Sequence, residues 1–393
     1  MRRPLLRVLS TISLLPALLV ACSQPAGEPG PAPSGGPAAP AEPPAAAAVS
    51  GICADVAALP LRDKLAQLLM VGVRDVADAR AVLTEHHVGG IFIGSWTDLA
   101  MLTDGSLHQL SESRAAAGPL PLAVGVDEEG GRVSRLSALI GKAPSARELA
   151  GESAGAAGDV YQSAWERGRR MRELGITVDF APVVDVTDAP DDDVIGDRSF
   201  GSDPARVTDY AGAYAAGLRS AGLLPVLKHF PGHGHGSGDS HTGGVTTPPL
   251  AQLQTVDLVP YRSLVTESPV AVMMGHLQVP GLTGTDPASL SEAAVRLLRE
   301  GTGYGAPAFD GLVFSDDLSS MAAISDRYGV AEAVLRALQA GVDIALWVTT
   351  DQVPAVLDGL EKATAAGDLP TAAVDASLAR LTAVKKPGTR CAG

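Results

Sequence analysis

The feature that most constrains this chain is the alternation, from Gly51 onward, of short apolar runs with longer helical patterns. The runs are rich in Val, Ile and Leu and lack polar alternation, as is typical of parallel strands covered on both faces. We expect eight strands, over 67–73, 89–94, 120–127, 176–185, 223–229, 270–276, 311–316 and 343–348. Helical patterns cover, among others, 161–174, 204–221, 250–266, 292–299, 331–340, 352–366 and 374–385. The pattern predicts an α/β fold, a (β/α)8 TIM barrel in one domain over 51–393, with an open doubly wound sheet as the alternative.

Polar residues at the carboxyl ends of the apolar runs favour the barrel. Five of the eight runs end in such residues: Asp127, Asp185, Lys228 with His229, His276, and Asp316 with Asp317. In a barrel these ends converge on one face, where active sites are found. A single polar residue there is more often a helix cap or a loop ion pair, but the recurrence indicates a site.

Charge and composition exclude several classes of protein. Lys plus Arg number 30 and Asp plus Glu 44, so the formal net charge is −14, and nucleic-acid binding is not expected. Aromatic residues make up only 4%, which argues against a wide aromatic platform for carbohydrate. Three cysteines exclude a disulfide-rich scaffold and a four-cysteine zinc module.

The N-terminus has the pattern of an export signal. Arg2, Arg3 and Arg7 precede an apolar run over 12–20, which is too short for a mature membrane-spanning helix. The run ends in Leu-Val-Ala-Cys, which resembles a bacterial lipobox with Cys22 as the lipid anchor. We therefore expect a lipoprotein signal peptide over 1–21, with an ordinary signal peptide as the alternative. The mature chain would carry a charge of −17.

Residues 22–50 consist mainly of Pro, Ala, Gly, Ser and Glu, a composition that cannot bury a core. We expect a disordered tether from the outer face of the cell membrane, facing the cell wall, with the lipid as the sole membrane contact. Cys53 and Cys391 lie at the two ends of the folded part. Because exported thiols are oxidised and domain termini often lie close together, we predict a disulfide between them, with two free thiols as the alternative.

The segment 228–241 is the most informative for chemistry, because it holds four of the eight histidines between glycines. Three interpretations compete. His229, His233 and His235 could bind a metal ion, or the histidines could bond backbone carbonyls in a structural loop. In the third, Asp239 and His241 form a carboxylate–imidazole pair for proton transfer, because the carboxylate fixes the tautomer.

Proton transfer of this kind needs a nucleophile on the other side of the site, and Asp316 is the candidate. Strand alternation sends Asp316 and Asp317 to opposite faces, and the residues alone do not decide which one enters the site. An aspartate nucleophile with a separate acid/base is the arrangement of a retaining glycosidase. A helix N-cap is the alternative role for either aspartate.

Four segments together resemble glycoside hydrolase family 3, and more narrowly its bacterial β-N-acetylglucosaminidases of peptidoglycan turnover. They are VDEEGGRV at 126–133, IGDRSFG at 195–201, KHFPGHG at 228–234 with DSH at 239–241, and FSDDL at 314–318. The resemblance runs over roughly 58–350. It implies a catalytic TIM barrel with Asp316 as nucleophile, His241 as general acid/base and Asp239 as its partner. Glu128, Asp197 and Ser320 depart from the common family residues without changing a catalytic atom.

The resemblance also implies the substrate-binding set Asp127, Arg135, Arg198, Lys228 and His229, with Arg132 supporting a loop. It implies no metal and no cofactor. The expected activity is a monomeric retaining exo-β-N-acetylglucosaminidase acting on a small carbohydrate, a GlcNAc-containing muropeptide or disaccharide. The alternatives are a β-glucosidase, an N-acetylglucosaminide phosphorylase, a non-catalytic cell-wall-binding lipoprotein and a metal-dependent amidohydrolase.

Overall fold

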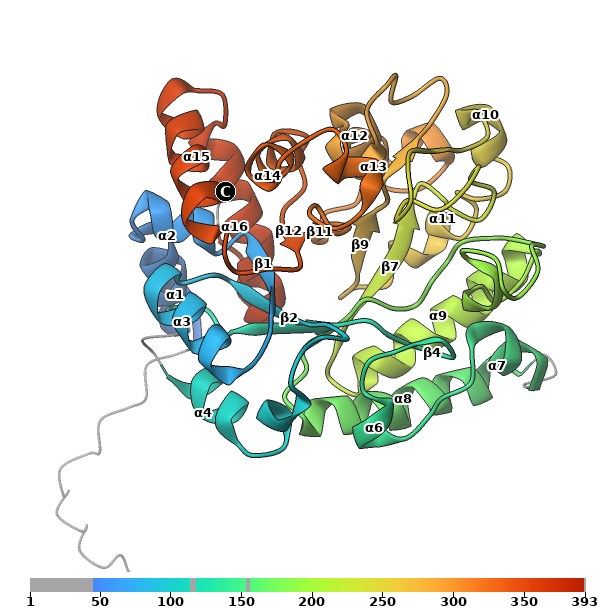
Figure 1. Ribbon diagram of the computed structural model, residues 1–393, viewed down its shortest axis with the longest axis horizontal. Coiled ribbons are helices and arrows are strands. Elements are labelled where there is room, and N and C mark those ends of the chain that lie inside the picture. The colour runs from blue at the N-terminus through green and yellow to red at the C-terminus, as the bar shows by residue number, and fades with distance from the viewer. Residues whose placement is uncertain (1–44, 114–117, 153–155, 392–393) are drawn as a thin grey trace, which may run out of the picture. The chain divides into compact units, whose positions relative to one another are not determined.

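The computed structural model describes residues 45–113, 118–152 and 156–391 (Figure 1). The predicted signal peptide, the lipid-anchor Cys22 and the tether up to residue 44 lie outside them. Pro44–Gly393 form one compact unit. Helix α1 (Ala45–Ala57) begins inside the segment 22–50 that the composition assigns to the tether. Its four leading alanines, the residues with the highest helix propensity, account for the earlier start.

Eight parallel strands form one sheet in the order β11-β9-β7-β6-β3-β2-β1-β12. A parallel bridge between Phe314 and Ile344 links the two edge strands, so the sheet closes almost completely. The predicted TIM-barrel-like domain is confirmed, and the open doubly wound alternative is wrong. The strands are β1 (Leu69–Val73), β2 (Gly90–Ile93), β3 (Ala123–Val126), β6 (Val178–Asp179), β7 (Leu224–Phe230), β9 (Ala271–Met274), β11 (Val313–Ser315) and β12 (Ala345–Trp347).

Seven of the strands lie within their predicted runs and are shorter than them, whereas β7 is shifted by one residue and ends at Phe230, beyond the predicted 223–229. The largest difference is in β6, which pairs over two residues of the predicted 176–185. Pro182 has no backbone N–H to donate to the ladder, and pairing resumes only at a bridge between Val183 and Lys228. The chain nevertheless keeps the direction of the strand and delivers Asp185 to the same end of the barrel as Lys228.

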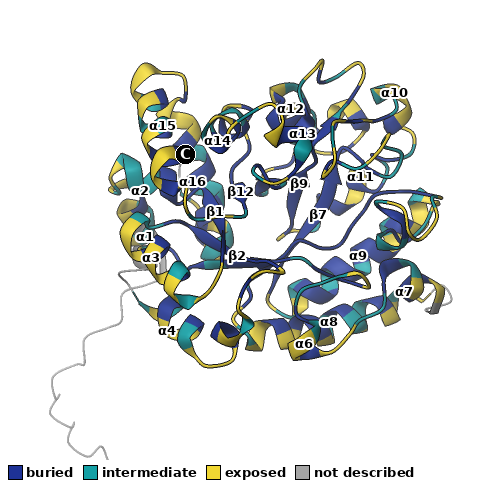
Figure 2. Ribbon diagram, viewed as in Figure 1, coloured by how far each residue is buried: buried dark blue, intermediate teal, exposed yellow. Residues whose placement is uncertain are grey.

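Long helices surround the barrel, with their exposed faces outward and the strands buried (Figure 2). The predicted helices appear as α8 (Ala157–Glu173), α9 (Pro204–Ser220), α12 (Glu292–Glu300), α14 (Val330–Gln339), α15 (Val353–Ala366) and α16 (Thr371–Lys385). Helix α9 starts at an Asp203 cap whose side chain accepts from Ala205 N at 3.0 Å, followed by Pro204 at its first position. Gly222, which ends the turn after this helix, has a φ of 85°, which favours glycine.

The predicted helix over 250–266 is wrong as one element. The structure has two short helices there, α10 (Leu250–Leu253) and α11 (Tyr261–Leu264). Pro260 has no N–H to bond to the preceding turn, so a continuous helix cannot pass through it. The turns between the two helices place Asp257 in the interior, where it is almost fully buried.

Shorter elements complete the unit. The helices are α2 (Leu61–Ala66), α3 (Val76–His86), α4 (Ser106–Glu112), α6 (Ser137–Ile140), α7 (Ala146–Glu152) and α13 (Ala322–Ser325). The extra strands are β4 (Glu128–Gly130) with β5 (Val133–Ser134), and β8 (Val245–Thr246) with β10 (Leu277–Gln278). Among the described residues, none of the helices is both long and apolar enough to cross a bilayer.

The two ends of the described chain are joined covalently. Cys53 in α1 and Cys391 after α16 form a disulfide, with a Cα–Cα distance of 5.4 Å. The pairing is the one that the positions of the cysteines predict. It connects the first helix to the last segment across a sequence separation of 338 residues.

Candidate active site

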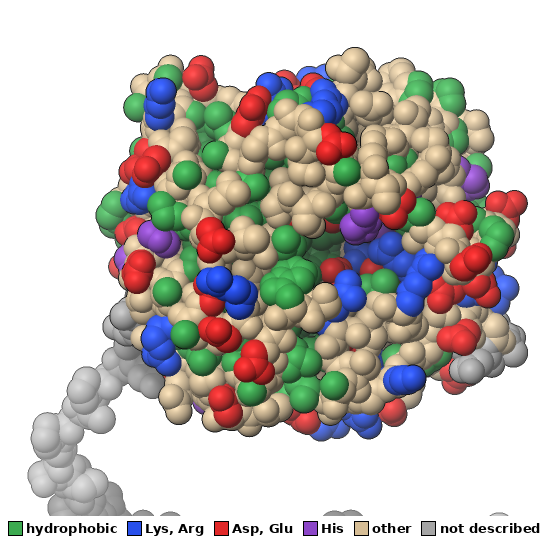
Figure 3. All heavy atoms as spheres, in the orientation of Figure 1, with side chains coloured by type: hydrophobic (Ala, Val, Ile, Leu, Met, Phe, Trp, Pro, Cys, Tyr) green, Lys and Arg blue, Asp and Glu red, His purple; other side chains and the backbone are tan. Residues whose placement is uncertain are grey.

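A cavity of about 290 Å³ lies at the carboxyl ends of the barrel strands. We call it the C-terminal cavity. Figure 3 shows basic, acidic and histidine side chains gathered around a hollow on this face. The lining includes all seven residues predicted to touch substrate or react: Asp127, Arg135, Arg198, Lys228, His229, His241 and Asp316. These residues lie at the ends of four barrel strands, β3, β6, β7 and β11, or in the segments that follow them, and they meet in one cavity.

The floor of the cavity is organised by Lys228 at the end of β7. Its Nζ lies 2.6 Å from Asp127 Oδ1 and 2.6 Å from Glu129 Oε1. The lysine side chain is 3% exposed, so the ammonium is held in place by two carboxylates and little water. Burial alone would lower the pKa of Lys228, but these carboxylates outweigh it and hold the pKa above its usual value.

Glu129 bonds to both Lys228 and a second cation, Arg198. Arg198 donates from Nε at 2.8 Å and from Nη2 at 2.9 Å to the two oxygens of the Glu129 carboxylate. Burial would raise the pKa of Glu129, but the Arg198 and Lys228 charges pull it far below its ordinary value. The bidentate pair fixes the guanidinium plane, so Arg198 presents its remaining donors to the cavity in a defined direction.

His229 is oriented by a buried carboxylate that the sequence placed at a strand end without a role. His229 Nδ1 lies 2.7 Å from Asp185 Oδ2, and Asp185 Oδ1 also accepts from the backbone N–H of His233 at 2.7 Å. Burial would raise the pKa of Asp185, but His229 outweighs burial and keeps the pKa below its usual value. The other ring nitrogen, Nε2, is thereby left for a ligand.

Lys228 and His229 are consecutive, yet both line the cavity, although neighbouring strand residues normally point to opposite faces. The register between β7 and β9 shifts between Leu227 and Phe230. This irregularity interrupts the alternation and directs both side chains to the same end of the barrel. Their peptide bond is cis.

Asp316, directly after β11, lines the cavity and is half-buried. Its Oδ1 accepts from the backbone N–H of Asp317 at 2.8 Å. Burial would raise the pKa of Asp316, but the His276, His229 and Lys228 charges outweigh it and hold the pKa below its ordinary value. The carboxylate therefore stays ionised, as a nucleophile requires.

The structure distinguishes the role of Asp316 from that of its neighbour Asp317, which the sequence pattern alone could not do. Both line the cavity, but the Asp317 carboxylate is occupied by the turn that follows. It accepts from the backbone N–H and the hydroxyl of Ser319, each at 2.8 Å, and from Ser320 N at 3.1 Å. Asp317 thus stabilises the turn over 318–320 and does not cap a helix, since α13 begins only at Ala322, whereas Oδ2 of Asp316 has no hydrogen-bond partner among the described residues.

His241 lies on the segment after β7 and is 64% exposed at the rim of the cavity. Its Nδ1 is 2.8 Å from Asp239 Oδ1, and the same oxygen accepts from His241 N at 2.9 Å. Burial would raise the pKa of Asp239, but these bonds with His241 hold it below its usual value. With Nδ1 engaged, Nε2 is the nitrogen available for proton transfer.

The loop that carries His241 is bonded to the segment after Asp316. The backbone N–H of Ala323 in α13 donates to Ser240 O at 3.1 Å, and that of Ala322 donates to His241 O at 3.4 Å. These contacts fix the end of the β7 loop against the end of β11. They explain how residues far apart in the sequence line one cavity.

Of the two remaining loop histidines, His235 has a carboxylate partner, whereas the buried Nε2 of His233 has no hydrogen-bond partner among the described residues. His235 Nδ1 lies 2.9 Å from Asp257 Oδ1, while His233 is buried against the His229 ring. Burial, with His229 nearby, lowers the pKa of His233. Within the described part of the chain, no three His, Cys, Asp or Glu side chains converge in a metal-ligating group.

Other residues around the cavity have roles that the motifs did not assign. Glu129 could have been found from its two-residue spacing to Asp127. His276, a predicted strand-end residue, contacts Asp317 O through Nε2 at 2.7 Å. Arg132 does not line the cavity and pairs with Asp197 at 3.0 Å, as expected for a loop support. Trp96, 44% exposed at the rim, follows β2 and carries no sequence signal.

Comparisons with known proteins agree with this geometry. A family model described as "Glycosyl hydrolase family 3 N terminal domain" matches residues 60–384. "Beta-hexosaminidase LpqI" of Mycobacterium tuberculosis (strain ATCC 25618 / H37Rv) is 66% identical over 390 residues, which cover 98% of each chain. The crystal structure of a GH3 family glycosyl hydrolase from Mycobacterium smegmatis superposes with a TM-score of 0.82. Its sequence is 72% identical to this one, and the match covers 85% of this chain and 99% of that chain. A family 3 beta-N-acetylglucosaminidase from Paenibacillus is 35% identical with a TM-score of 0.76, covering 84% of this chain and 62% of that one.

Proposed function

Because the chain belongs to glycosyl hydrolase family 3 and is a β-hexosaminidase, we propose that it releases terminal β-linked N-acetylglucosamine with retained configuration. The observation that carries this proposal is that Asp316 and His241 line the same cavity of about 290 Å³. A cavity of this size, at the lower end of the range for ligand sites, suits one sugar ring and hence removal of terminal residues.

The first step is attack by an Asp316 oxygen on the anomeric carbon. The bond from that carbon to the leaving oxygen breaks, and protonated His241 gives its Nε2 proton to this oxygen. Asp239 holds Nδ1 at 2.8 Å and stabilises the imidazolium before transfer. The product of this step is a covalent glycosyl-Asp316.

The second step returns the enzyme to its starting state. Neutral His241 accepts a proton from water at Nε2, and the water oxygen attacks the anomeric carbon while the bond to Asp316 breaks. Asp127, Lys228 and His229 orient the sugar hydroxyls through charge-assisted hydrogen bonds. Arg198 and Arg135, which also line the cavity, offer further donors.

The natural substrate in this proposal is a fragment of peptidoglycan with N-acetylglucosamine at its terminus. Such a leaving group is anionic and approaches a mature protein with a net charge of −17. Arg135 and Arg198 line the cavity and offset that repulsion locally.

Product analysis on a GlcNAc–MurNAc disaccharide, with and without phosphate, tests the proposal. Hydrolysis predicts free N-acetylglucosamine under both conditions, formed first as the β-anomer. N-acetylglucosamine 1-phosphate as the main product would instead identify a phosphorylase. Faster turnover of the β-glucoside than of the N-acetylglucosaminide would identify a β-glucosidase.

The same proposal places the enzyme outside the cell membrane, attached through Cys22. Its support is the basic residues, the apolar run over 12–20 and the lipobox-like Leu-Val-Ala-Cys. Expression in a bacterial host with labelled fatty acid should label the wild-type chain and leave the Cys22→Ala variant unlabelled. Equal labelling of both chains would contradict the anchor.

A further inference from the structure

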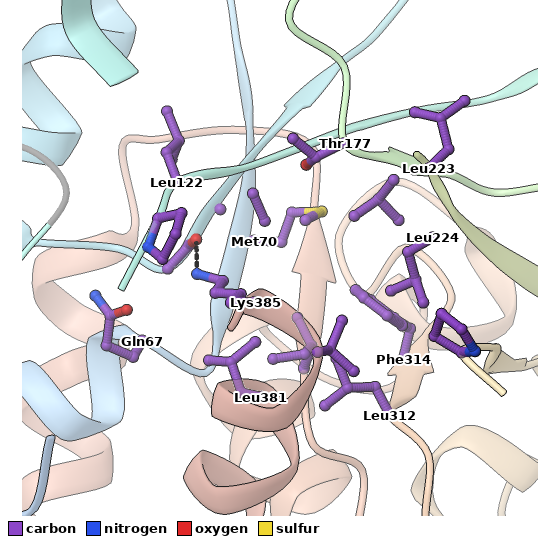
Figure 4. Close-up of a pocket in the computed structure, with 18 of the residues that line it drawn as sticks. Gln67, Met70, Leu122, Thr177, Leu223, Leu224, Leu312, Phe314, Leu381 and Lys385 are labelled. Carbon is purple, nitrogen blue, oxygen red and sulfur yellow. Dashed lines mark hydrogen bonds between the residues drawn. The ribbon is translucent and has the colours of Figure 1, made fainter. Parts of the chain in front are cut away.

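A second cavity, of about 530 Å³, lies at the opposite end of the barrel from the C-terminal cavity. We call it the N-terminal cavity. Its walls come from the first residues of the strands, and the last turn of α16 and the residues after it cover one side (Figure 4). The apolar lining includes Met70, Leu122, Leu224, Leu312, Phe314 and Leu381. Both its volume and its mainly apolar lining are those of a site for a small molecule.

Aromatic rings inside the barrel separate the two cavities. Phe314 lines the N-terminal cavity and Phe92 lines the C-terminal cavity. Phe180 lies between them, with ring centroids 5.4 Å from Phe314 and 5.8 Å from Phe92. A ligand of the N-terminal cavity would therefore not overlap with a sugar in the active site.

The charged groups of the N-terminal cavity are all cationic. Among the described residues that line it, Lys385, Arg172 and Arg219 are basic and none is acidic. Lys385 Nζ donates to the backbone oxygen of Gly89 at 2.7 Å, as Figure 4 shows, and forms no ion pair with any described side chain. This bias is notable in a chain with a net charge of −14.

Two further polar atoms at the walls lack partners. Gln67 is 3% exposed, and its Nε2 donates to His87 O, but its buried Oε1 receives no hydrogen bond. On the other side, Arg219 Nη2 pairs with Glu267 at 2.7 Å, while its buried Nη1 has no acceptor. Buried polar groups are normally satisfied. The free Arg219 Nη1 is a donor that an anion could accept from, whereas Gln67 Oε1 is an acceptor and gives no support to an anionic ligand.

We propose that the N-terminal cavity binds an aliphatic monocarboxylate, with the hydrocarbon chain among the leucines and Phe314 and the carboxylate on Lys385. An apolar body requires the apolar walls, and an anionic head group requires a cation without a competing carboxylate. A neutral hydrocarbon would leave Lys385 without an anionic partner. A dianion such as a sugar phosphate would meet too little polar surface.

The protonation state of Lys385 gives the proposal a pH signature. Burial lowers the pKa of Lys385 to about 7. The other charged groups that line the cavity are Arg172 from α8 and Arg219 from α9, and the described lining holds no acid that would stabilise the ammonium form. Above pH 7 Lys385 in the empty site is therefore mostly neutral and must take up a proton to pair with a carboxylate.

Calorimetric titration of the full chain with decanoate at pH 6.5 tests the inference. We expect one decanoate per chain, and at least tenfold weaker binding of decanol. Lys385→Met should weaken decanoate binding at least tenfold while leaving decanol unaffected. Val384→Phe, which keeps the lysine but fills space beside it, should weaken both ligands. Raising the pH to 8.5 should weaken decanoate binding several-fold in the wild type and not in Lys385→Met.

Several results would overturn the inference. They are no decanoate binding by the wild type, equal binding by wild type and Lys385→Met, or undiminished binding by Val384→Phe. Displacement of decanoate by millimolar N-acetylglucosamine would place it in the active site instead. Hydrolytic activity of both variants is expected to equal that of the wild type, which serves as the control for folding.

Discussion

At the scale of single residues, the site is a set of charges that hold one another in place. Glu129 pairs with Lys228 and with Arg198, and the lysine is shared with Asp127. Each cation is therefore fixed before a sugar arrives, which reduces the ordering that binding requires. Glu129 has a positioning role in this arrangement, because its oxygens are occupied by the two cations.

Replacing Glu129 by Gln should destabilise the protein by about 3 kcal/mol at neutral pH, since it leaves two buried cations short of a partner. The folded-state pKa of Glu129 lies far below its ordinary 4.5, so its stabilisation is complete above that value and is lost as the pH falls. The difference in melting temperature between wild type and Glu129→Gln should be largest at pH 6–7 and narrow between about pH 5 and pH 3.

Glu173→Gln is the matched control, because Glu173 is exposed and its partner Arg169 lies 3.9 Å away. This substitution should change the melting temperature little at any pH. A Glu129→Gln difference that stays constant with pH would contradict the charge-based explanation.

His241→Ala should separate substrates by their leaving groups. A proton donor contributes about 10²- to 10⁴-fold when the leaving oxygen is basic. We therefore expect kcat/KM for GlcNAc–MurNAc to fall by a factor in this range. The rate of the first step with p-nitrophenyl N-acetylglucosaminide should fall much less, because p-nitrophenolate leaves without protonation. Pre-steady-state release of p-nitrophenol and disaccharide kcat/KM are the measurements. Equal losses on both substrates would argue against proton donation.

At the scale of elements, the strands were predictable and their surroundings less so. All eight apolar runs contain barrel strands because continuous Val, Ile and Leu signal burial on both faces. The prediction of one helix over 250–266 was wrong, because Pro260 interrupts it. The apolar pattern continues through two short helices and does not show the break between them. The short pairs β4–β5 and β8–β10 span two or three residues per strand, too few for a period to be visible.

The loop between β7 and β8 depends on a contact that no motif revealed. Asp257, in the turns between α10 and α11, is buried beneath the loop and holds His235 at 2.9 Å. Burial raises the pKa of Asp257 despite His235, so the carboxylate depends on this imidazole for its main interaction. The contact ties the middle of the loop to the barrel, while Ala322 and Ala323 tie its end.

Asp257→Ala should loosen this loop and lower kcat about tenfold, because small displacements of an acid/base group are costly. Hydrogen exchange of peptides over 231–241 should rise in the variant, with the barrel strands unchanged. Asp326→Ala is the control, because Asp326 is exposed at the end of α13, and this variant should leave both the exchange and kcat unchanged. Unchanged exchange with reduced kcat would mean that Asp257 acts in some other way.

At the scale of the whole molecule, the sequence predicted which residues share the site but not how they are held. The strand-end positions and the family motifs placed Asp127, Lys228, His229 and Asp316 on one face. The choice of Asp316 over Asp317 could not come from alternation, because it rests on the bonds that Ser319 and Ser320 make to Asp317. The N-terminal cavity was not predictable, because Lys385 and Gln67 meet only in the folded chain.

The Cys53–Cys391 disulfide closes almost the whole folded chain into one loop, so it restricts the unfolded state strongly. The double variant Cys53→Ala/Cys391→Ala should lose about 2–5 kcal/mol of unfolding free energy. Its kcat should remain near that of the wild type, because neither cysteine lines the C-terminal cavity. Denaturant unfolding with an activity assay measures both. A large loss of kcat without a loss of stability would contradict this view.

The central claim, that Asp316 forms a bond to the sugar, is tested most directly by trapping. A 5-fluoro N-acetylglucosaminyl fluoride slows breakdown of a glycosyl-enzyme, so the adduct can be located by peptide mass spectrometry. We predict one adduct per chain, on Asp316 in the peptide that contains FSDDL, and none in Asp316→Ala. An adduct on Asp317 or another residue, or steady turnover of the reagent by Asp316→Ala, would contradict the claim.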